Sequence, residues 1–66
     1  MTEEQKREME RVIAIKLRVV DIRPDFKRVR DELNGIKRAL EIMGFQLNVF
    51  YDMYGNSPST FEIVKI

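Results

Sequence analysis

The stretch IAIKLRVV, residues 13–20, decides how the fold is interpreted, because it fits a strand and yet follows strong helix formers without a break. In a strand, Ile13, Ile15, Leu17 and Val19 would share one face, opposite Lys16. In a helix, Lys16 would fall inside the stripe formed by Val12, Val19 and Val20. Many of these residues are β-branched, a type that is enriched in strands. The pattern therefore predicts a strand over 12–20, and a helix from 2 to 22 stays open as the alternative.

The segment before this stretch predicts a short helix. Thr2 can cap it, Gln5 completes a capping box, and Glu3 and Glu4 suit the positive end of the helix dipole. Only Met9 offers an apolar anchor, so residues 1–11 are expected to fray.

The segment after it predicts a long helix, because Pro24 ends the preceding element and a regular row of apolar residues follows. Spacings of 3, 4, 3, 4 and 3 separate Phe26, Val29, Leu33, Ile36, Leu40 and Met43. Gly44 stands where a C-terminal cap belongs. Gly35 costs about 1 kcal/mol relative to alanine within a helix. Because Gly35, Ala39 and Ile42 line one flank, we expect another backbone to approach there.

Two further strands are predicted. Residues 45–51 alternate in polarity, residues 60–66 have strand composition, and turn-forming residues lie between them. The chain is thus predicted to be one small α+β domain over 1–66, with a short N-terminal helix followed by β-α-β-β. One long helix would cover a three-stranded sheet in which 60–66 lies between the parallel strands 12–20 and 45–51. The alternative is two helices followed by a β-hairpin.

The composition argues against catalysis. The 66 residues include neither cysteine nor histidine, so thiolate metal sites and the usual general base are absent. Ser57, Ser59 and Thr60 are interpreted as turn residues. The glycines are too far apart in the sequence to form a phosphate-binding loop. No enzyme activity, cofactor, metal or small-molecule substrate is predicted. In outline, the βαβ order and the length resemble the small tautomerases, whose catalytic group is an N-terminal proline. This chain begins Met1-Thr2, and its Pro24 is internal.

Length and apolar content indicate the environment and the oligomeric state. No run approaches the roughly 20 apolar residues of a membrane span, and the first residues are acidic, unlike a signal peptide. A cytoplasmic protein without a membrane partner is expected. Because a chain this short buries only about 60% of its unfolded surface, a homodimer is expected to supply further stability.

Two groups of residues are candidate binding sites. Residues 11–40 carry nine cations and four carboxylates in a chain whose net charge is +1. If 12–20 is a strand, this basic segment forms a sheet face and helix start that could contact nucleic acid, with the residues Lys16, Arg18, Arg23, Lys27 and Arg30. The tip of the predicted hairpin carries residue types enriched at protein interfaces, namely Phe50, Tyr51, Met53 and Tyr54.

The predicted function is therefore binding. We expect a small regulatory protein that acts as a homodimer and engages a larger protein partner, as many accessory proteins of phages and mobile elements do. The alternative is a nucleic-acid-binding module that uses the basic residues. Salt-sensitive binding would favour the alternative, because phosphate contacts release counterions.

Overall fold

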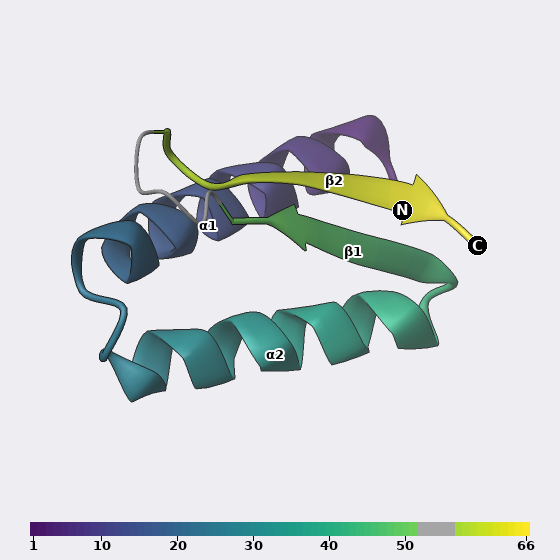
Figure 1. The fold of residues 1–66 in the computed structure, drawn as a ribbon. Coiled ribbons are helices and arrows are strands. Elements are labelled where there is room, and N and C mark those ends of the chain that lie inside the picture. Colours follow the sequence, from purple (N-terminus) through teal and green to yellow (C-terminus); the bar gives the residue numbers. More distant parts are fainter. Residues whose placement is uncertain (52–56) are drawn as a thin grey trace.

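The structure, a computed structural model, describes residues 1–51 and 57–66 and contains two helices followed by a two-stranded hairpin. Along the chain, the elements are α1 (Glu3–Ile22), α2 (Lys27–Ile42), β1 (Phe45–Phe50) and β2 (Thr60–Lys65) (Figure 1). The predicted α+β class is confirmed, and the arrangement is the alternative one. The predicted three-stranded sheet under a single helix is wrong, because residues 12–20 are helical.

Helix α1 contains the ambiguous stretch because its buried residues follow the helical period. Ile13, Leu17 and Val20 are buried, and Met9 packs against them one turn earlier, which gives spacings of 4, 4 and 3. The strand preference of β-branched residues is weak, and burial of this stripe outweighs it. Lys16 lies at the edge of the stripe, where its aliphatic stem is partly covered and its ammonium group reaches α2.

The predicted capping box at the start of α1 is confirmed. The Thr2 backbone N–H donates to Oε1 of Gln5 over 3.0 Å, and the Gln5 backbone N–H donates to Oγ1 of Thr2 over 3.1 Å. These two bonds satisfy donors that a helix start otherwise leaves unpaired. The helix then continues to Ile22 without interruption, so the short N-terminal helix and the following segment are one element.

Helix α2 confirms the middle of the apolar seam that the sequence predicts, whereas the outer members are the N-cap residue Phe26 and the half-exposed C-cap residue Met43. Leu33 and Leu40 are buried, and Val29 and Ile36 pack beside them. Gly44 follows the C-cap residue Met43 and has φ 89°, a left-handed conformation that favours glycine. The backbone thus turns sharply from α2 into β1.

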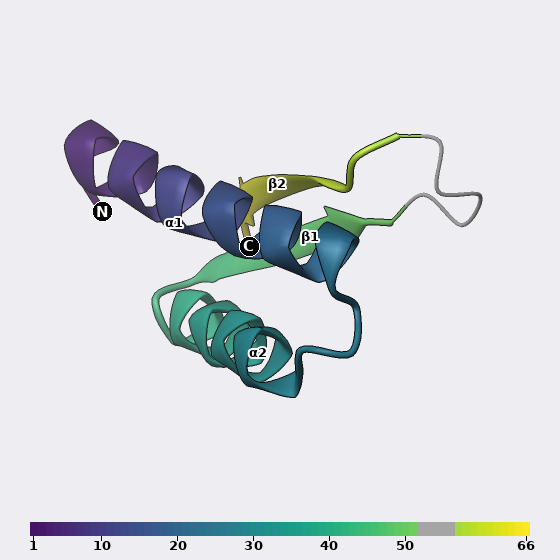
Figure 2. The same ribbon diagram turned by 90° about the vertical axis from the view of Figure 1, so that its left-hand side faces the viewer.

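The hairpin forms the second layer of the molecule. Strand β1 pairs with β2 in antiparallel register, with Leu47 opposite Ile63 and Val49 opposite Phe61. These four side chains belong to the apolar core with residues of both helices, so α1 and α2 cover the same face of the hairpin (Figure 2). The other face, which carries Phe50 and Val64, is open to solvent. Among residues 1–51 and 57–66, six form the buried core: Ile13, Leu17, Val20, Leu33, Leu40 and Leu47.

Gly35 has no close neighbour within the described chain. A Cβ atom added there would meet nothing within 4 Å, and the residue is exposed. Within the described residues, no other backbone of this chain approaches Gly35, contrary to the expectation. The backbone of α2 is therefore exposed to solvent at this position.

Candidate functional site

The end of the hairpin exposes two consecutive aromatic side chains. Phe50, the last residue of β1, is 54% exposed, and Tyr51 is 53% exposed. Phe50 lies on the open face of the hairpin, because its cross-strand partner is Thr60 and the core-facing pairs alternate with this one. Met53 and Tyr54, which complete the predicted interface, lie outside the described residues.

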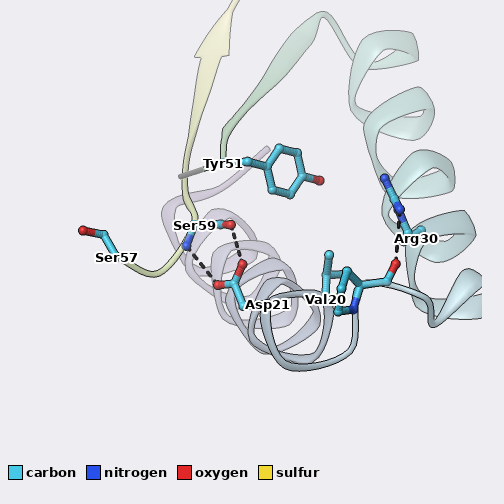
Figure 3. Close-up of a pocket in the computed structure, with 7 residues that line it drawn as sticks. Val20, Asp21, Arg30, Tyr51, Ser57 and Ser59 are labelled. Atoms are coloured by element: carbon cyan, nitrogen blue, oxygen red, sulfur yellow. Dashed lines mark hydrogen bonds between the residues drawn. The ribbon is translucent and has the colours of Figure 1, made fainter. Parts of the chain in front are cut away.

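A pocket of about 300 Å³ opens beside Tyr51 and between the ends of several elements. Its walls come from the end of α1, the α1–α2 turn, α2 and the two flanks of the hairpin loop, and they consist of Val20, Asp21, Pro24, Arg30, Tyr51, Ser57 and Ser59. Figure 3 shows the Tyr51 ring extending from β1 toward Arg30 across this space. The pocket thus combines an aromatic ring and a guanidinium group.

A carboxylate clamp holds one wall of this pocket. Oδ2 of Asp21 accepts the Ser59 backbone N–H over 2.9 Å, and Oδ1 accepts the Ser59 hydroxyl over 2.5 Å (Figure 3). The two bonds join the last turn of α1 to the chain just before β2. Hydrogen bonds to a charged acceptor are stronger than neutral ones, so they fix the hairpin relative to the helices.

Arg30 is held on the opposite wall. Its Nη1 donates to the carbonyl oxygen of Pro24 over 3.2 Å, which orients the guanidinium group while leaving donors unused. The pocket suits a polar side chain whose acceptor reaches Arg30 on the wall opposite the Asp21 carboxylate. It lacks a histidine or cysteine, and within residues 1–51 and 57–66 no group of three His, Cys, Asp or Glu residues could hold a metal ion.

The predicted basic sheet face does not exist. Lys16 and Arg18 lie on α1, two positions apart and so on different sides of the helix. Arg23, Lys27 and Arg30 instead gather around the turn between α1 and α2, where the Arg23 guanidinium lies 5.7 Å from the Phe26 ring centre. The sheet face is wrong because it rested on a strand over 12–20, and contact of these cations with nucleic acid stays a prediction.

Lys16 forms an ion pair that connects the two helices. Its Nζ binds Oε2 of Glu32, and Nε of Arg28 lies 3.5 Å from Oε1 of the same carboxylate. The hydrogen bond from Lys16 is the main reason that the pKa of Glu32 is lowered from its ordinary value of 4.5. This pairing makes Lys16 a structural link between α1 and α2 and leaves its charge largely compensated.

We expect the stabilising effect of Glu32 to disappear in acid. Because the pKa of Glu32 is lowered in the folded state, its contribution is present above the unfolded pKa and is lost as the pH falls through the folded pKa. Glu32→Gln should therefore lower the urea midpoint slightly at neutral pH and leave it unchanged in strong acid. Asp31→Asn, an exposed neighbour, is the control. An equal effect of Glu32→Gln at both pH values would contradict this assignment.

Sequence reasoning missed the pocket because its walls are far apart in the chain. The Asp21–Ser59 clamp spans 38 positions, and no motif connects the two residues. Tyr51 was predicted as an interface residue and Arg30 as a nucleic-acid contact, yet the fold places both around one pocket. The aromatic residues at the hairpin end were the one signal that pointed to this region.

Comparison with protein-family models, with curated proteins and with solved structures gave no match. Among the described residues, no helix is both long and apolar enough to cross a membrane. The arrangement of the residues themselves therefore carries the functional argument.

Proposed function

We propose that this chain is a non-enzymatic regulatory protein of the cytoplasm that acts as a homodimer and engages a larger protein partner through the end of its hairpin. The observation that supports the proposal is the pairing of two half-exposed aromatic residues, Phe50 and Tyr51, with the pocket between Tyr51 and Arg30. Tyrosine and arginine are enriched among the residues that contribute most to binding energy at protein interfaces.

The pocket is also well organised for recognition. The Asp21 clamp restrains the hairpin, and the Pro24 carbonyl restrains Arg30. A site held in place before binding loses less conformational entropy when a partner docks. A protein segment that inserts a polar acceptor between the Tyr51 ring and Arg30 would meet complementary chemistry there.

Nucleic-acid binding is the second candidate function. Arg23, Lys27 and Arg30 surround the α1–α2 turn, and phosphate groups bind such clusters of cations. Two observations weigh against it: Lys16 is paired with Glu32, and Arg18 lies on α1 away from this turn. The open hairpin face likewise carries Glu62, whose Oε1 accepts a bond from Nδ2 of Asn48 over 3.2 Å.

Affinity capture from a lysate of the source organism tests the proposal. Wild-type protein should retain a stoichiometric protein partner after nuclease treatment and in high salt. The double variant Phe50→Ala/Tyr51→Ala should bind that partner at least about a hundredfold more weakly, since residues that dominate an interface contribute about 2 kcal/mol or more each. Val64→Ala removes an exposed apolar side chain from the same face and should bind normally.

The outcomes separate the two functions. Partner capture that survives in the double variant would refute the hairpin end as the interface. Capture that is lost with nuclease or salt would replace the proposal by nucleic-acid binding, because phosphate contacts weaken steeply as salt rises.

A further inference from the structure

Helix α1 carries a second apolar row that does not face its own core. Val12, Ile15, Val19 and Ile22 recur at spacings of 3, 4 and 3, which places them along one side of the helix. Ile15 is 58% exposed and Ile22 is 79% exposed, although isoleucine side chains are apolar and usually buried in a core. Such a row has the spacing of a seam between two packed helices.

A groove continues this row toward the start of α1. It has a volume of about 460 Å³, lies between the start of α1 and the end of α2, and is lined by Met1, Gln5, Glu8, Met9, Val12 and Met43. Val12 belongs to both the row and the groove. Methionine side chains are unbranched and adapt their shape to what they contact, so this groove can receive a single apolar side chain.

We propose that a second copy of this chain covers the row, with its α1 antiparallel to the first. The proposal rests on the homodimer of the proposed function and names its interface. In the register that we infer, Val12 faces the second copy's Ile15, and Ile22 faces the second copy's Gln5. The exposed Ile22 then enters the groove of the other copy, twice in the dimer, as a two-fold axis requires.

The charges along α1 favour the antiparallel direction. Residues 3–10 carry four carboxylates and two cations, whereas residues 11–22 carry three cations and one carboxylate. Antiparallel packing brings the acidic half of one helix against the basic half of the other, with Glu8 near the second copy's Arg18. Parallel packing would bring like charges together, and the helix dipoles would also oppose it.

The same register gives a reason for the bare surface at Gly35. The two-fold axis passes between Val12 and Ile15, and the ion pair from Lys16 to Glu32 shows which levels of α1 and α2 correspond. The axis level lies two to three positions before Lys16 on α1, which corresponds to two to three positions after Glu32 on α2, at the level of Gly35. An added Cβ there would meet nothing in its own chain, so the α2 helices of two copies can approach closely at this point.

Analytical ultracentrifugation of matched variants tests the interface. Wild-type protein should dimerise, and Ile15→Glu should weaken the dimer at least about a hundredfold, because it buries a charge at the centre of the row. Ala14→Glu adds the same charge at the neighbouring exposed position, on another side of α1, and should leave dimerisation unchanged. Far-UV circular dichroism checks that each variant is folded.

Each outcome has a distinct meaning. A monomeric wild type would refute the homodimer of the proposed function and this interface with it. A dimer that Ile15→Glu does not weaken would overturn the α1 interface alone, and the homodimer would stand with another surface.

Disulfide trapping tests the antiparallel register, since the chain has no cysteine of its own. Glu8 faces the second copy's Val19, so an oxidised mixture of Glu8→Cys and Val19→Cys chains should form a covalent heterodimer. Either variant alone should not, because its two thiols would lie about 16 Å apart along the helices, beyond the reach of a disulfide. Rapid crosslinking of Val19→Cys alone would indicate parallel helices and overturn the register.

Discussion

Replacing Leu40 with alanine is expected to lower the free energy of unfolding by about 3 kcal/mol. Leu40 is fully buried in the core that α2 shares with α1 and the hairpin. Its truncation removes apolar contacts and leaves a cavity that so small a core fills poorly. A chain of this length has a total stability of roughly 3–10 kcal/mol, so the variant should lose a large part of it.

Urea unfolding at a fixed protein concentration measures this loss, since dimerisation makes apparent stability depend on concentration. Glu41→Ala is the control, because Glu41 is the exposed neighbour of Leu40 in α2 and lies away from the Gly35 flank. Its effect should stay within about 0.5 kcal/mol, as for most surface substitutions. Similar midpoints for the two variants would show that Leu40 is not a core residue.

Replacing Ala14 with proline is expected to destabilise the protein by about 3 kcal/mol or more, because proline within a helix removes a backbone hydrogen bond and clashes with the preceding turn. Ala14 is exposed in the middle of α1, so its side chain contributes little and the loss reports on the backbone. The variant therefore tests directly whether residues 12–20 are helical.

The control for this experiment is Ala14→Gly, which should cost about 1 kcal/mol through helix propensity alone. Thermal unfolding followed by far-UV circular dichroism measures both variants. An edge strand can tolerate proline where the N–H faces solvent. A proline variant as stable as the glycine variant would thus argue against the helix.

Much of the local structure could be predicted from the sequence. The Thr2–Gln5 capping box, the middle of the apolar seam of α2 and the left-handed Gly44 all follow from short-range rules, and all three are present. The strands at 45–50 and 60–65 were also predicted within one residue at each end. These features depend on neighbours within a few positions, which a single sequence displays.

Residues 12–20 were misassigned because α1 is apolar on two sides. Ile13 and Leu17 face the core, and Ile15 and Val19 lie on the outer row, so alternate positions become apolar as in a strand. A helix with one apolar stripe would have shown its period clearly. The candidate pocket could not be predicted either, since Tyr51 and Arg30 meet only once the hairpin has docked on the helices.

The order of the elements has a consequence for how fast the chain folds. α1 packs on α2 and β1 pairs with β2, so neighbours in sequence are neighbours in space, and few contacts join the chain's distant parts. Proteins dominated by such local contacts cross their folding barrier rapidly. Because α2 also packs on β1, we expect the four elements to assemble through contacts between successive neighbours, with the hairpin docking on α2 as it forms. The bonds between Asp21 and Ser59, which close a span of 38 positions, would then form last and complete the candidate pocket.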